Sequence, residues 1–129
     1  MPARDSAGPF ALPDWHNLLM GHFIYGPGAE YEIEDRTLAH LKVAILAKLR
    51  VQESFLLNWT IEPSQGSGRV SVWLDPAIPI QFRFSGSRVP ELNPVWLEAL
   101  AHSSHSTRGM VIMAEAEAVD YLAANKPAA

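Results

Sequence analysis

The fold is decided by the stretch EDRTLAHLKVAILAKLR at residues 34–50, which has the period of one amphipathic helix. Asp35 or Glu34 is expected to cap its start, because a carboxylate accepts hydrogen bonds from backbone N–H groups that lack a helical partner. Lys48 and Arg50 fall in the last turn, where positive charge complements the helix dipole. Apolar residues recur along one side of this helix; they are Leu38, Leu41, Ile45 and Leu49. The stretch therefore predicts a helix that covers a sheet with this side and keeps its basic residues in solvent.

The composition is typical of a single globular domain. The chain has 129 residues, of which 48% are apolar, enough for a core of its own. A net charge of −4 argues against a strong overall attraction to nucleic acid but allows a local basic patch. The absence of cysteine excludes disulfides and thiolate metal sites, and it fits a reducing compartment. No apolar run has the length of a membrane span and no signal peptide is recognisable. We therefore expect a cytoplasmic protein without membrane contact.

The residues before the helix divide into two parts. Residues 1–19 show no clean period and are interrupted by prolines, so they form either an ordered arm or a leader before an alternative start at Met20. From there on, residues 22–25 have the pattern of a short strand, residues 26–28 that of a turn, and residues 30–34 alternate apolar and acidic side chains. This order predicts a β-hairpin leading into the helix.

The residues after the helix predict a meander and a second helix. Strand patterns occupy residues 55–61, 69–74 and 80–84, and a last short one occupies residues 110–113. The second helix is expected from Asn93-Pro94, an N-cap followed by proline at the first helical position, to His102. The element order is then ββαβββαβ. It predicts an α+β fold with a single antiparallel sheet of about five to six strands and two helices packed on one face. The domain would span residues 20–114, with an Ala-rich C-terminal tail at residues 115–129.

The other face of that sheet is the strongest candidate for a binding site. The alternation of the strands turns a set of polar and aromatic side chains away from the helices. The candidate residues are Asn58, Arg69, Ser71, Trp73, Gln81 and Arg83. Three interpretations remain open. In the first, the face is only solvated. In the second, it pairs with a second subunit or another protein, since Trp and Arg are common interface anchors. In the third, it binds nucleic acid, with bases stacked on Trp73 and phosphates on Arg69 and Arg83.

No pattern for catalysis, a cofactor or a metal stands out. His102 and His105 lie near the end of the second helix, where histidine is favoured by the helix dipole, and structural metal sites need more ligands close by. The serines at 103, 104 and 106 lie next to His105, but adjacency in sequence is not the geometry of a catalytic triad. We therefore expect no catalytic residues, no cofactor and no bound metal.

Four segments form a recognisable pattern: MGHFIYG at residues 20–26, IEDRTLAHL at 33–41, VWL at 72–74 and WLEAL at 96–100. Through these segments the chain resembles, from Met20 to about residue 114, a group of small actinobacterial proteins of uncharacterised function. Such proteins are often labelled automatically as ATP-dependent DNA ligases. Ligases of that class attach AMP to the lysine of a Lys-x-Asp-Gly motif, which this chain lacks. The resemblance therefore implies at most a nucleic-acid context and no ligase activity.

These observations together favour a non-enzymatic binding or assembly module that associates with itself or with a protein partner. The alternative is a nucleic-acid-binding accessory protein that uses the same sheet face.

Overall fold

The computed structural model describes residues 19–61 and 66–125. The proposed N-terminal arm or leader and the end of the Ala-rich tail lie almost wholly outside these ranges. The strands are β1 (Met20–Tyr25), β2 (Ala29–Glu34), β3 (Phe55–Thr60), β4 (Arg69–Leu74), β5 (Ile80–Arg83) and β6 (Met110–Val111). The helices are α2 (Asp35–Leu49), α3 (Pro94–Ser103), the 3-10 turn η3 (Glu115–Glu117) and α4 (Ala118–Asn125).

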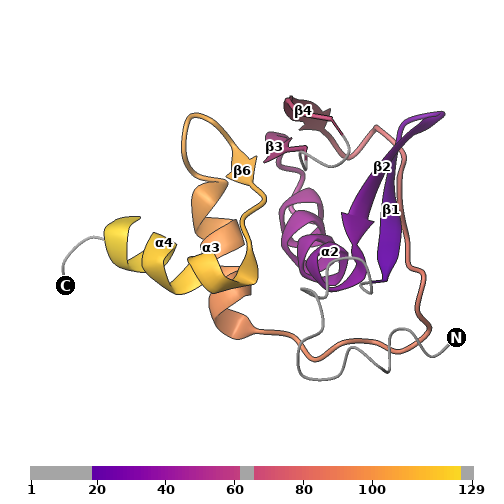
Figure 1. Ribbon diagram of the computed structural model, residues 1–129. Coiled ribbons are helices and arrows are strands. Elements are labelled where there is room, and N and C mark those ends of the chain that lie inside the picture. The colour runs from indigo at the N-terminus through magenta and orange to yellow at the C-terminus, as the bar shows by residue number, and fades with distance from the viewer. Residues whose placement is uncertain (1–18, 62–65, 126–129) are drawn as a thin grey trace, which may run out of the picture.

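Helix α2 lies at the centre of the molecule, between the β1–β2 hairpin and α3 (Figure 1). Its apolar side is buried as predicted, with Leu38 and Ile45 fully inaccessible to solvent. Glu34 is the N-cap: its carboxylate accepts hydrogen bonds from the backbone N–H groups of Arg36 at 3.0 Å and Thr37 at 3.1 Å. Glu34 and Asp35 were the two residues expected to cap this helix. Glu34 caps it, and the carboxylate of Asp35 makes a different contact.

The carboxylate of Asp35 instead fixes the chain that follows β5. It accepts hydrogen bonds from the backbone N–H groups of Ser85 at 3.1 Å and Gly86 at 2.8 Å. Gly21 lies against the same carboxylate, and a Cβ there would approach Asp35 Oδ1 and Arg83 O to 2.6 Å. The start of α2 therefore holds both the first strand and the segment after β5.

The prediction of a single antiparallel sheet is wrong, because the strands form two sheets of three. One has the order β2-β1-β5 and is antiparallel throughout, while the other has the order β4-β3-β6. Strand β6 pairs in parallel with β3, with Leu57 opposite Met110. A strand that returns after a crossover helix runs in this direction, and α3 provides that crossover. Strands β4 and β5, which the sequence pattern predicts as neighbours in one sheet, belong to different sheets.

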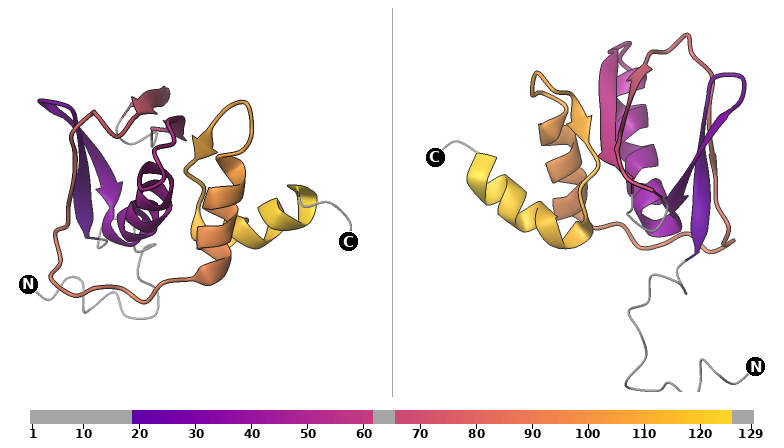
Figure 2. Two further views of the ribbon diagram at one scale, coloured as in Figure 1. Left: turned by 180° about the vertical axis from the view of Figure 1, so that it is seen from behind. Right: turned by 45° about the horizontal axis from the view of Figure 1, so that its top comes forward.

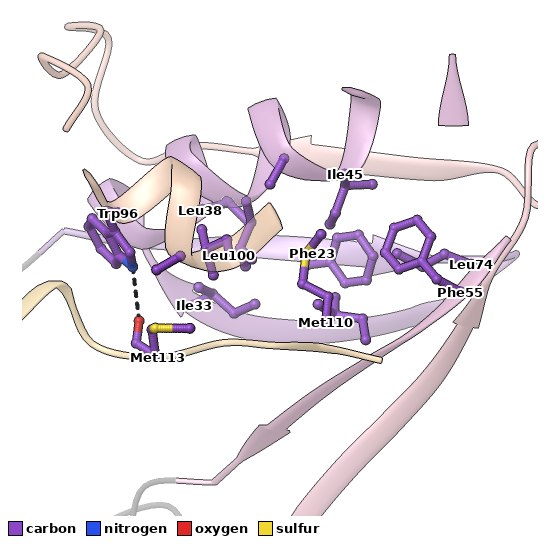
Figure 3. Packing of buried hydrophobic residues seen from close by; sticks show 14 of the residues in the cluster. Phe23, Ile33, Leu38, Ile45, Phe55, Leu74, Trp96, Leu100, Met110 and Met113 are labelled. Atoms are coloured by element: carbon purple, nitrogen blue, oxygen red, sulfur yellow. Dashed lines mark hydrogen bonds between the residues drawn. The ribbon is translucent and has the colours of Figure 1, made fainter. Parts of the chain in front are cut away.

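The core lies between the two sheets and the helices. Figure 3 shows a continuous row of buried side chains from Trp96 at one end to Phe55 and Leu74 at the other, with Met110 of β6 between them. The Trp96 indole N–H donates to the carbonyl of Met113 at 3.1 Å, so this buried polar atom is satisfied. The prediction that Asn93 caps the second helix is confirmed.

The C-terminal residues add a third α-helix that the predicted fold did not count. Helix α4 lies on the outer side of α3, away from α2 (Figure 2). Its Ala118 and Leu122 are buried and belong to the core cluster. The Ala-rich tail therefore contributes to the packed part of the protein over residues 118–125.

Candidate functional site: an open sheet face

The candidate residues from the sequence divide between the two sheets. Asn58, Arg69, Ser71 and Trp73 lie on β3 and β4 and share one face of the β4-β3-β6 sheet. The alternation predicted for these strands is confirmed, since Leu57, Val72 and Leu74 point into the core and are buried. We define the face that carries the four candidate residues, on the side of the sheet away from the core, as the open face.

Gln81 and Arg83 do not belong to the open face. They lie on β5, in the β2-β1-β5 sheet, because β4 and β5 are not paired. Arg83 also has an acidic partner: its guanidinium donates to Glu30 Oε1 of β2 at 3.2 Å. The expected pair of arginines for phosphate contact, Arg69 with Arg83, is therefore not formed.

A polar pair occupies the middle of the open face. The Ser71 hydroxyl donates to Asn58 Oδ1 at 2.5 Å, across the β3–β4 ladder. The amide of Asn58 donates in turn to the carbonyl of Arg108 at 2.5 Å and, more weakly, to that of Met110 at 3.3 Å. Asn58 thus ties the chain just before and within β6 to the centre of the sheet.

An apolar pair occupies one end of the open face. Trp73 is 50% exposed, and its cross-strand neighbour Leu56 is 36% exposed. The backbone of Trp73 is fixed from the other sheet, because the Tyr25 hydroxyl donates to the Trp73 carbonyl at 2.6 Å. A tryptophan on such a supported strand presents a large apolar surface at little cost in conformational entropy.

A groove of about 770 Å³ lies at the edge of β3 that β6 leaves unpaired beyond Asn58. It is lined by residues 58–60 of β3, residues 69–71 of β4, and Arg108, Val111 and Ile112 next to β6. Its lining comes from both sides of the sheet, because Trp59 and Val70 lie on the core-facing side. Arg108 was not predicted as a site residue. The sequence marks it only as the residue before Gly109 and a short strand, and it gives no sign that this strand runs beside β3. The parallel pairing of β6 places Arg108 next to β3, on the side of the sheet opposite to β4.

The carboxyl group whose pKa is lowered most is that of Glu115, which lies outside the open face and stabilises the fold. Arg36 donates two hydrogen bonds of 2.8 Å to Glu115, and Asn93 donates one of 2.9 Å. These contacts, first that with Arg36, lower the pKa of Glu115 to about 2. The pKa of Asp75 is lowered by hydrogen bonds from the Ser54 hydroxyl and the Ala77 backbone, and that of Glu53 by Lys48. All three carboxylates fix loops or helix ends.

The serine and histidine residues near the end of α3 contribute to structure. The buried Ser103 hydroxyl donates to the Leu100 carbonyl at 2.8 Å and accepts from the Val111 N–H at 3.0 Å, which anchors β6. The ring of His102 packs edge-on against Tyr121, with centroids 5.9 Å apart. Within residues 19–61 and 66–125, no three His, Cys, Asp or Glu side chains are grouped so as to hold a metal ion. None of the helices in these ranges has the length and apolar character needed to cross a bilayer.

The fold and the open face define a small α+β protein with one sheet surface that carries aromatic, polar and cationic side chains. The chain belongs to a protein family described as a domain of unknown function (DUF7882), which matches residues 20–115. No curated protein and no solved structure matches the chain. The match covers the same part of the chain as the resemblance from Met20 onward, and the description of the family names no activity.

Proposed function

We propose that this protein is a non-enzymatic binding module whose partner surface is the open face, and that the partner is a second copy of the chain or another protein. The observation that supports this proposal is the half-exposed side chain of Trp73. Trp is enriched among the residues that contribute most to binding at protein interfaces. Its neighbour Leu56 extends the apolar area along the same face.

The polar surroundings of this apolar pair match the composition of an interface. Ser71 and Asn58 lie next to the pair and satisfy each other in a hydrogen bond of 2.5 Å. A partner that covers them therefore leaves no new unsatisfied group, which would otherwise weaken binding. Interfaces commonly place such polar residues around an apolar centre.

Sedimentation velocity over a range of protein concentrations tests the proposal for a second copy. The wild-type protein should show a mass that rises with concentration, and Trp73→Ala should remain a monomer. Val89→Ala is the matched control, because Val89 is an exposed apolar residue in the segment between β5 and α3. Equal behaviour of the two variants would contradict the role of Trp73. A wild-type monomer at all concentrations would exclude the second copy and leave a different protein as the partner.

A second candidate function is nucleic-acid binding through the same face. The observation in its favour is that Arg69 and Arg108 are exposed and form no ion pair within the described part of the chain. Arginines of this kind contact phosphates, and the resulting affinity falls steeply with salt. Titration of short labelled single- and double-stranded DNA and RNA at low and moderate salt tests this function. Absence of binding at low salt would exclude it.

The proposed location is the cytoplasm. A chain without cysteine has no need of an oxidising compartment for its folding. Fractionation of cells that produce the untagged protein, followed by detection with an antibody, tests the location.

A further inference from the structure

His40 of α2 is a titratable side chain that the core encloses completely. Both of its ring nitrogens bind backbone groups. Its Nε2 atom lies 2.8 Å from the backbone nitrogen of Asn93, which can only donate, so Nε2 is the acceptor and carries no proton. The proton is then on Nδ1, which donates to the carbonyl of Arg36 at 2.8 Å. The contact with Asn93 therefore requires a neutral ring.

This contact attaches the start of α3 to the middle of α2. Asn93 is the N-cap of α3, and its side-chain oxygen accepts from the N–H of Val95 at 2.9 Å. A histidine that takes up a second proton becomes a donor at both nitrogens. Nε2 can then no longer accept, so the N–H of Asn93 has to leave the ring. Histidine is also the side chain that usually changes charge between about pH 8 and pH 5.

Charged groups from several elements lie around this contact. The Glu115 carboxylate of η3 accepts from the Arg36 guanidinium at 2.8 Å and from the Asn93 side-chain amide at 2.9 Å, and it interacts electrostatically with His40. Glu34 at the start of α2 and Glu91 before α3 act on Arg36. The pKa of Glu115 is about 2, chiefly because of Arg36, so this carboxylate stays charged in mild acid and attracts a positive ring.

The folded protein can hold the charged ring in place. The imidazole stacks on Trp96 of α3, with centroids 4.3 Å apart and an interplanar angle of 29°. The face of an indole attracts a cation. A proton on His40 therefore strengthens the contacts with Trp96 and Glu115 while it breaks the contact with the backbone of Asn93. The expected change is local to the start of α3.

We infer that His40 is an acid-sensitive latch: uptake of a proton at Nε2 releases the backbone N–H of Asn93 and loosens the first turn of α3, while Trp96 and Glu115 retain the ring. The proton comes from solvent when the contact opens. The open form binds one proton more than the closed form, so a fall in pH favours the open form. This inference goes beyond the proposed function, because it concerns the attachment of α3 and does not involve the open face.

An NMR titration of the full chain, labelled with nitrogen-15, from about pH 7.5 to about pH 5 tests the inference. The ring nitrogens of His40 should change from the neutral to the protonated form, and the amide resonance of Asn93 should shift with the same midpoint. Protection of the Asn93 amide against hydrogen exchange, relative to an unfolded chain at the same pH, should fall by up to about ten-fold for each pH unit below that midpoint. The amide of Phe23, which is fully buried in β1, should keep its protection and so report that the protein stays folded.

Two variants separate His40 from the other histidines. His40→Gln removes the titratable ring and supplies an oxygen that can accept the N–H of Asn93, so the response of Asn93 to pH should disappear. His105→Gln is the matched control, because it removes an exposed histidine just after α3 and should leave that response unchanged.

The inference is overturned if the His40 ring stays neutral throughout the titration, or if it takes up a proton without a change at Asn93. Equal loss of protection at Phe23 and Asn93 would also overturn it, since acid would then unfold the whole protein. These three outcomes are read from the wild-type protein, so they decide the question even where His40→Gln does not fold. A response of Asn93 that persists in a folded His40→Gln would overturn the inference as well.

Discussion

The hydroxyl of Tyr25 donates a hydrogen bond of 2.6 Å to the carbonyl of Trp73, and this contact joins the two sheets at the point where the strand order breaks. Tyr25 ends β1 and Trp73 lies near the end of β4. The N–H of Gly26, the next residue, donates to the carbonyl of Pro79 at 2.9 Å and extends the pairing of β1 with β5 within their own sheet. The contact between Tyr25 and Trp73 therefore links the two sheets through one side chain, where a continuous sheet would have a backbone ladder.

We predict that Tyr25→Phe lowers the free energy of unfolding by about 0.5–1 kcal/mol. The substitution keeps the ring and removes a single hydrogen bond, and the carbonyl of Trp73 can then bind water because this region is exposed. Urea denaturation followed by circular dichroism measures the change.

Tyr31→Phe serves as the control for Tyr25→Phe. The ring of Tyr31 packs against Trp59, and its hydroxyl has no hydrogen-bond partner among the described residues, so its loss should leave stability unchanged. Equal destabilisation by both variants would show that the contact between Tyr25 and Trp73 does not stabilise the junction of the sheets.

Local patterns predicted the elements well because each depends on neighbouring residues. The helix over residues 34–50 follows from the spacing of its apolar side chains, and the alternation in β3 and β4 correctly separates Val72 from Trp73. The division into two sheets depends on contacts between distant residues, such as Tyr25 with Trp73. A period of two in a strand does not identify the strand beside it.

The candidate site was predicted only in part, because the pattern within a strand shows which side chains share a face but does not show which strand lies beside it. Asn58, Ser71 and Trp73 share the open face because they lie on adjacent paired strands. Arg83 was assigned to it by assuming that β5 continues the meander, and Arg108 was missed because its position depends on a parallel pairing formed after α3. The basic residue Arg36, expected in solvent, is held by Glu115 from a segment 79 residues away.

We predict that the stability of the wild-type protein falls as the pH decreases from about 4.5 toward 2. The folded-state pKa of Glu115, about 2, lies below its ordinary value of 4.5, chiefly because of Arg36. This carboxylate therefore stabilises the fold fully above pH 4.5, and its contribution is lost as the folded form becomes protonated. Its side chain is 37% exposed, so screening by solvent reduces the contribution to about 1–2 kcal/mol.

Glu115→Gln should reduce both the stability at neutral pH and its dependence on pH below 4.5. Urea denaturation at several pH values measures both effects. Arg36→Gln combined with Glu115→Gln gives a double-mutant cycle, in which the two losses should not add because the residues share two hydrogen bonds. Additive losses, or an unchanged slope with pH in Glu115→Gln, would contradict this assignment.

We predict that Gly109→Ala destabilises the protein by about 2 kcal/mol or more. Gly109 has a φ of +90°, and a Cβ there would lie 2.5 Å from the carbonyl oxygen of Leu56. The close approach of β6 to β3 depends on this missing side chain, so the substitution should also displace Arg108. Thermal unfolding measures the loss of stability. Gly28→Ala is the control, because a Cβ at that position meets no atom within 4 Å, and its unfolding temperature should differ little from that of the wild type.

We predict that His40→Leu lowers the free energy of unfolding by about 1–3 kcal/mol although it makes the core more apolar. His40 is fully buried, and its ring stacks on Trp96 with centroids 4.3 Å apart. Its Nε2 atom accepts the backbone N–H of Asn93 at 2.8 Å, which requires the proton to be on Nδ1, where it is donated to the carbonyl of Arg36 at 2.8 Å. Leucine fills similar space but leaves the N–H of Asn93 without an acceptor at the start of α3.

His40→Gln separates the loss of the acceptor from the loss of the ring. Its side-chain oxygen can accept the N–H of Asn93, so this variant should recover part of the stability lost in His40→Leu even though it cannot stack on Trp96 as the imidazole does. Guanidinium chloride denaturation of the two variants beside the wild type measures the order of stabilities. If His40→Leu is the more stable of the two, burial of the apolar side chain outweighs the hydrogen bond to the N–H of Asn93. The position of Asn93, and with it the N-cap of α3, would then not depend on the histidine.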